Sequence, residues 1–582
     1  MGRPAMGSVH VVRVKSRHTV ASGETREYMT PLLRRSFRRA DGTVGKQTVA
    51  NLSTLPAAAV DAIEAVLKGK TLLDAEAALA VTRSLPHGHV ALVAAAATKL
   101  GLPALLGPAC RERDLAYALI VSRVLRPRPK LSTLAWWNDT TLGADLGVSG
   151  ASRDEVYAAM DWLLGRQDAI EAGLAGRHLR EGGMAMFDLS SSWLEGRHCA
   201  LAARGYSRDG KKTKLQIEYG LLTDPEGRPV AIRVFPGNTA DPTAFTAAVE
   251  VVRTKFGIAR LTLIGDRGMI TSARIEALKD LGGLGWITCL RAPAIAKLAA
   301  DDGPLQLSLF DTQDLAEISH PDYPGERLIA CRNPALAAER ARKREALLAA
   351  TEAALAPIRT AVAEGRLAGA DRIGVKIGKV IDKYKMSKHF NLTITDTGLE
   401  ITRRAEQIAA EAALDGIYVL RTSVPSEDLE APAAVAAYKN LAAVERDFRS
   451  LKTIDLDLRP IHHYLTDRVR AHALICMLAC YLTWHLRRDL AELTYTDEHP
   501  PARDNPVAPA TRSGPAARKA ARHTDATDQP LHSFRGLLDH LATLTRNTIT
   551  IGQATIDKIT TPTPTQHRAF ELIDTSIPLT LK

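Results

Sequence analysis

The most regular pattern of apolar and polar positions lies between residues 183 and 290. Residues 184–189 form a short apolar run, and residues 215–221 and 230–234 alternate between apolar and polar side chains. A period of two is typical of a half-buried strand, so this pattern predicts three strands. Residues 224–227, with the sequence Asp-Pro-Glu-Gly, are typical of a turn and predict a hairpin between the second and third strands.

Beyond the hairpin, helical spacing alternates with further strands. Apolar residues at 245, 249, 252 and 256 predict a helix, residues 261–265 a strand, residues 272–281 a helix and residues 284–290 a fifth strand. The resulting order, β-β-β-α-β-α-β, matches a ribonuclease H-like core that lacks only its late helix. We therefore expect an α/β protein in which a ribonuclease H-like mixed sheet is interrupted by a large insertion, with a mainly helical N-terminal region.

The remaining patterns divide the chain into segments. Proline-rich, charged sequence between residues 497 and 529 favours disorder, and a short helix is expected near residues 531–544. The expected segments are a basic hairpin region (1–60), a helical DNA-binding or dimerisation region (61–180), the first part of the ribonuclease H-like core (181–291), an insertion (292–430), the last helices of the core (431–490), a disordered linker (491–530) and a C-terminal tail (531–582).

Composition and charge narrow the class of protein. A hydrophobic fraction of 46% excludes a wholly disordered chain, and the formal net charge of +11 attracts polyanions such as nucleic acid. The six cysteines show neither a CxxC pair nor zinc spacing, which argues against a disulfide framework or structural zinc. The apolar window at residues 473–484 is shorter than the roughly 20 residues of a membrane span. No signal peptide is recognisable at the start, and we expect a cytoplasmic protein without a membrane partner.

The helical region contains basic and aromatic residues close together. Arg123, Arg126, Arg128 and Lys130 precede the pair Trp136 and Trp137. This grouping suits a DNA-binding helix, and it equally suits a solvated basic edge beside tryptophans of the core. The sequence leaves both interpretations open.

Two aspartates of the predicted core lie at positions that suit metal binding. Asp188 lies inside the apolar run Met-Phe-Asp-Leu-Ser, where an ionised carboxylate is costly unless a cation or hydrogen-bond donors compensate it. Asp266 ends the fourth strand. In a ribonuclease H-like sheet these strands are neighbours, which would bring both carboxylates within reach of one Mg²⁺. By contrast, Asp241 precedes Pro242 and is interpreted as a helix cap.

The third acid is expected on a helix over residues 433–452. Tyr438, Glu445 and Lys452 recur every seven residues, which is nearly two helical turns, so they should share one face. A carboxylate between a phenol and an ammonium group suits metal binding with phosphate contacts on either side. Asp447 would face another side of the helix, which makes Glu445 the better candidate.

These positions carry a resemblance to a known family. The segment YKNLAAVERDFRSLKT resembles the Tyr-x2-Arg-x3-Glu-x6-Lys signature of DDE transposases of the insertion-sequence-four superfamily, in particular the insertion sequence 1634 group. Three of the four signature positions match, and Leu441 stands where the family has arginine. Further similar blocks occur in the family's order at residues 187–190, 205–229, 237–241, 265–268 and 467–472.

The resemblance implies a function and a set of site residues. Asp188, Asp266 and Glu445 would be the catalytic acids and would hold two Mg²⁺ ions, with Mn²⁺ as an alternative. DNA contacts would come from five residues, Tyr438, Lys452, Arg449, Arg446 and Arg267. The enzyme would bind the terminal inverted repeats of an insertion sequence, cleave the ends and join them to target DNA, acting as a homodimer. A metal-dependent DNA nuclease and an inactive DNA-binding relic of a transposase remain as alternatives.

Overall fold

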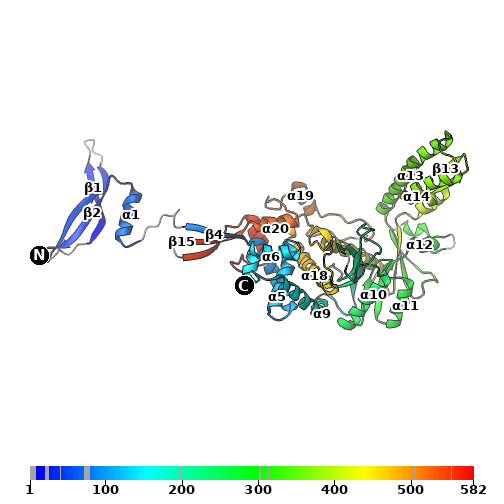
Figure 1. Ribbon diagram of the computed structural model, residues 1–582, viewed down its shortest axis with the longest axis horizontal. Coiled ribbons are helices and arrows are strands. Elements are labelled where there is room, and N and C mark those ends of the chain that lie inside the picture. The colour runs from blue at the N-terminus through cyan, green and yellow to red at the C-terminus, as the bar shows by residue number, and fades with distance from the viewer. Residues whose placement is uncertain are drawn as a thin grey trace. The chain divides into compact units, whose positions relative to one another are not determined.

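The computed structural model describes residues 8–19, 25–39, 41–70, 79–196, 198–300, 303–311, 313–503, 505–551 and 554–581. The chain forms two compact units (Figure 1). One contains Met1–Ser84 and Asn547–Ile559, and the other contains Leu85–Arg546 and Thr560–Lys582. The acids predicted from the sequence all lie in the second unit.

The first unit holds two small sheets. Its first sheet has the order β1-β2-β3, with antiparallel strands at Val9–Thr19, Thr25–Arg38 and Val44–Asn51, and is followed by α1 (Ala57–Leu67). The second sheet has the order β16-β15-β4 and is formed by Ala554–Ile559, Thr545–Ile551 and Leu79–Pro86.

The second unit begins with a helical region. Its helices are α3 (Gly88–Lys99), α4 (Leu102–Leu106), α5 (Arg111–Leu125), α6 (Lys130–Asn138), α7 (Thr141–Asp145), α8 (Arg153–Gly165) and α9 (Gln167–His178). Residues 115–125 of α5 are all buried, and α5 packs against α8 and α18 (Thr466–Asp489). Trp137 is fully buried and donates a hydrogen bond to Ser122 Oγ at 2.8 Å. The tryptophan pair is therefore part of the core.

An eight-stranded mixed sheet follows the helical region. Its order is β10-β11-β14-β9-β8-β5-β6-β7. The five strands and two helices expected over residues 183–290 are present as β5 (Gly183–Trp193), β6 (Gln216–Thr223), β7 (Pro229–Pro236), α10 (Asp241–Glu250), β8 (Leu261–Ile264), α11 (Ser272–Leu281) and β9 (Leu284–Cys289). The pairs β5 with β8 and β8 with β9 are parallel, and β5 with β6 and β6 with β7 are antiparallel.

Aromatic residues attach helices to both faces of this sheet. Phe187 of β5 lies 6.3 Å, between ring centroids, from Phe245 of α10. On the other face, Tyr219 of β6 lies 5.8 Å from Phe448 of α17 (Leu441–Arg449). Because neighbouring residues of a strand point to opposite faces, β5 and β6 can hold a helix on each side.

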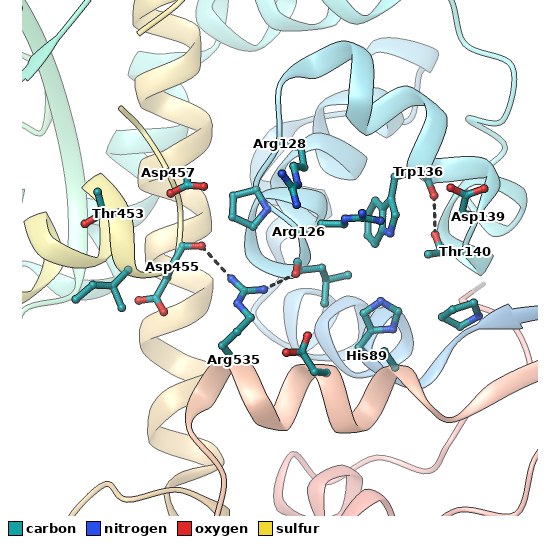
Figure 2. A pocket seen from close by; sticks show the side chains of 16 residues that line it. His89, Arg126, Arg128, Trp136, Asp139, Thr140, Thr453, Asp455, Asp457 and Arg535 are labelled. Atoms are coloured by element: carbon teal, nitrogen blue, oxygen red, sulfur yellow. Dashed lines mark hydrogen bonds between the residues drawn. The ribbon is translucent and has the colours of Figure 1, made fainter. Parts of the chain in front are cut away.

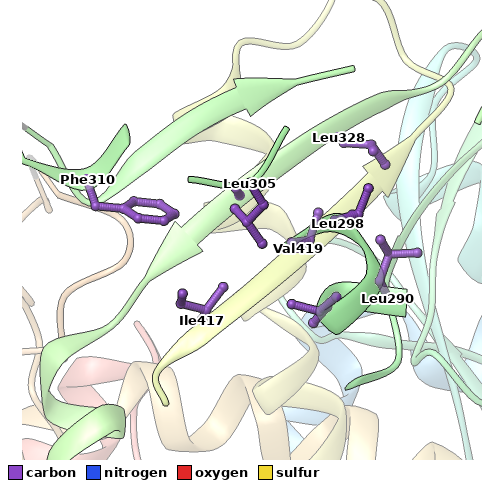
Figure 3. Close-up of a cluster of buried hydrophobic side chains, with 9 residues drawn as sticks. Leu290, Leu298, Leu305, Phe310, Leu328, Ile417 and Val419 are labelled. Atoms are coloured by element: carbon purple, nitrogen blue, oxygen red, sulfur yellow. The ribbon is translucent and has the colours of Figure 1, made fainter. Parts of the chain in front are cut away.

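The segment expected to be an insertion contributes to the sheet. Three of its strands, β10 (Leu315–Ile318), β11 (Arg327–Arg332) and β14 (Ile417–Thr422), extend the sheet beyond β9 with antiparallel pairing. Figure 3 shows the apolar cluster that packs these strands against α12 (Ala292–Leu298), with Leu298, Leu328 and Val419 among its members. Part of the segment is thus continuous with the core.

Between β11 and β14 the chain forms a structure with its own apolar clusters. It contains α13 (Pro334–Ala363), α14 (Ala370–Tyr384), the hairpin of β12 (Phe390–Ile394) and β13 (Leu399–Arg403), and α15 (Ala405–Ala413). Leu355, Ile373 and Ile377 are at the centre of one cluster. By length and composition, α13 and α18 could each cross a membrane, but 83% of the most apolar window of α18 is buried inside the protein.

Two later segments differ from the sequence-based expectation. The helix predicted over residues 433–452 is divided into α16 (Ala431–Lys439), α17 and a π-helical turn at Ser450–Ile454. The segment expected to be a disordered linker, residues 491–530, contains α19 (Gly514–Arg522), and Val507 is fully buried. The linker acquires order because Lys439 Nζ binds the Val507 carbonyl at 2.6 Å and Ser513 caps α19.

The segment expected to be a C-terminal tail is also folded. It contains α20 (Phe534–Ala542), strands β15 and β16, and α21 (Pro564–Leu572). Leu537 and Leu541 of α20 are fully buried, and α20 packs against α3. The helical region thus depends on residues far along the chain.

Candidate active site

Asp188 and Asp266 are placed side by side by two parallel strands. In the register of β5 and β8, Met186 pairs with Ile264. Asp188 lies two residues after Met186, and Asp266 lies two residues after Ile264, so the two acids are at the same level of the sheet. Asp188 is partly buried within β5, whereas Asp266 follows the end of β8 and is exposed.

The electrostatics of Asp188 show that three acids share one neighbourhood. The pKa of Asp188 is raised to about 7, mainly by burial and in smaller part by the negative charges of Asp266 and Glu445. The Leu189 N–H, which donates to Asp188 Oδ1 at 2.8 Å, and the charge of Arg208 act in the opposite direction. Because three negative charges act on one another here, binding a cation in addition to Arg208 would be favourable.

Glu445 is carried by α17, whose buried side fixes its direction. Val444 and Phe448 are buried, and Phe448 contacts Tyr219 of the sheet, while Glu445 itself is exposed. Asp447 faces the interior instead. Burial raises the pKa of Asp447 to about 8, and its Oδ2 has no hydrogen-bond partner among the described residues.

The three carboxylates have the donor chemistry that Mg²⁺ requires, because this ion is bound through oxygen ligands, usually with several retained waters. Among the residues that the structure describes, however, no three acidic, histidine or cysteine side chains are arranged to hold an ion as they stand. Asp188, Asp266 and Glu445 would therefore have to move closer together to share one.

Tyr438 and Arg267 lie beside the second acid. The charges of Asp266 and Arg267 both act on Tyr438, and burial raises the pKa of its hydroxyl well above the usual value. Arg267 is exposed next to Asp266. Tyr438 of α16 thus lies near the end of β8, and its role in DNA binding stays a prediction.

Lys452 is held differently from the expectation. The π-helical turn buries it, and its Nζ donates to Asp209 Oδ1 at 2.8 Å. Arg459 binds the same carboxylate. In contrast, Arg446 and Arg449 are exposed on α17, and neither has an ion-pair partner among the described residues. Of the basic residues predicted here, these two are free to meet an anion.

An ion network beside the acids was missed by the sequence analysis. Arg208 Nη2 donates to Asp241 Oδ1 at 2.7 Å, and its Nη1 lies 3.6 Å from Glu218 Oε1. Burial raises the pKa of Glu218 to about 7. The interpretation of Asp241 as a cap is not supported, since Ala240 is the N-cap of α10 and Asp241 binds Arg208 instead. A glutamate in the middle of the apolar strand β6 was the available signal.

A hollow of about 640 Å³ lies near the end of the π-helical turn. Figure 2 shows Arg535 reaching from α20 to this hollow, where its Nη2 donates to the Asp455 carbonyl at 3.0 Å and its Nη1 to the Leu125 carbonyl. Arg126 and Arg128 are exposed on the wall. Arg535 thereby ties α20 to both α5 and the segment that follows Lys452.

The comparison with known protein families agrees with this geometry. Residues 195–482 match the family model of the transposase DDE domain. The matched range contains Asp266 and Glu445 and begins shortly after Asp188. No curated protein matches the chain. The family match and the large mixed sheet in an α/β structure support a DDE transposase, a class of enzyme that acts on DNA and generally uses divalent metal ions.

Proposed function

We propose that this protein binds the terminal inverted repeats of an insertion sequence, cleaves the ends and joins them to target DNA. The observation that carries the proposal is the parallel register of β5 and β8, which places Asp188 beside Asp266, together with the charge of Glu445 that reaches Asp188. Two of these acids lie within the match to the transposase DDE domain. The formal net charge of +11 suits a polyanionic substrate.

The fold proposed for the catalytic part is ribonuclease H-like. The strand order β7-β6-β5-β8-β9 supports this proposal, because the first strand lies centrally, between the hairpin and the two parallel strands. The residues between β9 and α16 would then be an insertion that extends the sheet. The late helix would be α17, which brings Glu445 to the sheet from a distant part of the chain.

In the proposed mechanism Asp188, Asp266 and Glu445 hold divalent metal ions, Mg²⁺ or Mn²⁺. Such ions, when bound, activate a water or 3′-hydroxyl and stabilise the leaving oxygen in an in-line phosphoryl transfer. The same three acids would serve cleavage and joining. Asp188 has to be ionised to act as a ligand, although burial favours its neutral form.

Basic and phenolic side chains would position the DNA around these acids. Arg446 and Arg449 are free to bind phosphates, and Arg267 and Tyr438 lie beside Asp266. Lys452 would contribute to DNA binding indirectly, because its bond to Asp209 holds the π-helical turn in place.

The finer assignment follows the sequence signature. We propose membership of the insertion-sequence-four superfamily and its insertion sequence 1634 group, with Leu441 in place of the signature arginine. We also propose a homodimer that bridges two DNA ends in the bacterial cytoplasm, associated with the nucleoid when bound.

A cleavage and strand-transfer assay tests the proposal. A labelled duplex that carries the element's own end is incubated with Mg²⁺ or EDTA and with the wild type, Glu445→Gln or Glu430→Gln. Glu430 is exposed at the start of α16 and serves as the matched control. We expect Mg²⁺-dependent nicking and joining by the wild type and Glu430→Gln, and binding alone by Glu445→Gln. Cleavage without joining would indicate a nuclease, and binding without cleavage by the wild type would indicate a relic.

A further inference from the structure

Arg208 lies among three acids of the candidate active site, Asp241, Glu218 and Asp188. Its guanidinium binds Asp241 at 2.7 Å and lies 3.6 Å from the carboxylate of Glu218. Its positive charge also acts on Asp188. The backbone N–H of Arg208 donates a hydrogen bond to Ser191 Oγ of β5 at 3.0 Å. This bond anchors the residue to the strand that carries Asp188.

Asp241 extends the reach of Arg208 to the second acid. A Cβ atom added at Gly268 would lie 3.4 Å from Asp241 Oδ2 and 3.9 Å from Asp266 Oδ2. These two carboxylate oxygens therefore face the same small space. One oxygen of Asp241 binds Arg208, and the other is directed toward the space beside Asp266.

The network is incompletely satisfied. Arg208 Nη1 and Glu218 Oε2 are buried without a hydrogen-bond partner among the described residues, and the Glu218 side chain is only 3% exposed. Buried polar atoms without partners are costly, so this arrangement is held by charge rather than by a full set of hydrogen bonds. It can rearrange without the loss of many bonds.

We propose that Arg208 is the internal counter-cation of the acidic centre, a positioning residue that balances the charge of Asp188 without touching it, and balances the space beside Asp266 through Asp241, until a divalent cation binds. This inference rests on the proposed metal site of the transposase. Because Arg208 and a divalent cation would both act on the charge of Asp188, their effects oppose each other. Arg208 therefore weakens cation binding and stabilises the cation-free protein.

The test measures Mg²⁺ binding to the full-length protein without DNA by isothermal titration calorimetry, together with melting temperatures in EDTA and in Mg²⁺. For Arg208→Gln we expect Mg²⁺ affinity to rise on the order of tenfold. The melting temperature should fall strongly in EDTA and less in Mg²⁺. Arg208→Lys, which keeps the charge, should bind Mg²⁺ much as the wild type does.

Arg228→Gln is the matched control. Arg228 also binds a buried aspartate, Asp224, and its side chain is 20% exposed compared with 19% for Arg208. Arg228 lies on the β6–β7 turn. We expect Arg228→Gln to lower the melting temperature equally in EDTA and Mg²⁺ without a change in Mg²⁺ affinity. Asp241→Asn provides a second variant, in which Arg208 is released toward Asp188 and Mg²⁺ affinity should fall.

Three results would overturn the inference. Unchanged or weaker Mg²⁺ binding by Arg208→Gln would contradict it while leaving the proposed metal site intact. Equal loss of stability in EDTA and Mg²⁺ would assign Arg208 a purely structural role. If Asp188→Asn binds Mg²⁺ as well as the wild type does, the proposed metal site fails, and the counter-cation role fails with it.

Discussion

Lys452 Nζ lies 2.8 Å from Oδ1 of Asp209, a carboxylate whose side chain is 1% exposed. The two residues are 243 positions apart in the chain, and the contact joins the π-helical turn after α17 to the loop before β6. The same loop carries Arg208. Lys452 is therefore part of the framework around the acids as the structure stands, rather than an open phosphate contact.

This pair predicts different effects for two neighbouring cations. Lys452→Ala leaves Asp209 with Arg459 alone, and we expect the free energy of unfolding to fall by about 2 kcal/mol. Arg449→Ala removes an exposed cation and should leave stability nearly unchanged while it weakens DNA binding. Denaturant unfolding and the salt dependence of DNA affinity distinguish them. A steep loss of DNA affinity at full stability in Lys452→Ala would contradict the prediction.

The second prediction concerns a basic stripe on α14. Arg372, Lys376, Lys379 and Lys383 are exposed at helical spacing along one side, and none has an ion-pair partner within the part of the chain that the structure describes. The bond from Lys385 lowers the pKa of Asp382 most, and the charge of Lys212 adds to it, which places α14 near the loop that carries Arg208.

If DNA follows this stripe, Lys376→Glu and Lys379→Glu should each lower the slope of log affinity against log salt by about 0.9. Lys343 of α13, which already pairs with Glu339 at 2.6 Å, is the control and should change the slope much less when replaced by glutamate. Equal effects at Lys376 and Lys343 would show that only net charge matters.

The third prediction concerns His485 and pH. Burial lowers the pKa of His485 to about 4, and its Nε2 has no partner among the described residues. In the unfolded chain His485 binds a proton near pH 6.5, whereas in the folded protein it does so only near pH 4. The free energy of unfolding therefore falls as the pH drops from about 6.5 toward 4. His485→Phe should retain about 1 kcal/mol more stability than the wild type at pH 5, relative to pH 7.5.

Thermal unfolding at a series of pH values measures this difference. The exposed residue His198 provides the control, because His198→Asn should follow the wild type at each pH. Parallel curves for the wild type and His485→Phe would mean that His485 does not contribute to acid lability.

The fourth prediction concerns close backbone packing at Gly237. A Cβ atom there would lie 2.0 Å from the Gln216 carbonyl oxygen and 2.7 Å from that of Ala203. Gly237→Ala should cost about 2 kcal/mol or more and displace the turn that leads to Asp241, which lowers cleavage as well as stability. Gly176→Ala in α9, where the added atom meets nothing within 4 Å, should instead stabilise the protein slightly. Similar losses in both variants would exclude the packing argument.

Local periodicity was sufficient to predict the central part of the fold. The strands β6 and β7 alternate in period two, β5 begins as a short apolar run around Asp188, and β8 is a short apolar run that precedes Asp266. The neighbourhood of Asp188 and Asp266 followed from parallel pairing of their strands. Glu445 could be placed because Val444 and Phe448 mark the buried side of its helix.

Other features depend on contacts between distant residues, which periodicity does not record. Strand β10 has only four residues, and its place at the sheet edge is determined by pairing with β11. The turn at Ser450–Ile454 buries Lys452 against Asp209, although a regular helix would have aligned Lys452 with Glu445. Proline content suggested disorder around Val507, whereas tertiary contacts with Lys439 order it.

The hydrogen bonds formed by Arg535 have a consequence for when the proposed activity can arise during synthesis. Arg535 holds α5 and Asp455, Arg546 forms a bidentate pair with Asp145 at 2.8 and 2.9 Å, and the Pro578 carbonyl binds His87 at 2.7 Å. During synthesis the acids leave the ribosome long before these partners do. A nascent chain that ends before residue 535 would carry all three acids on an incomplete helical region, so the proposed DNA cleavage should begin only after translation has passed this residue.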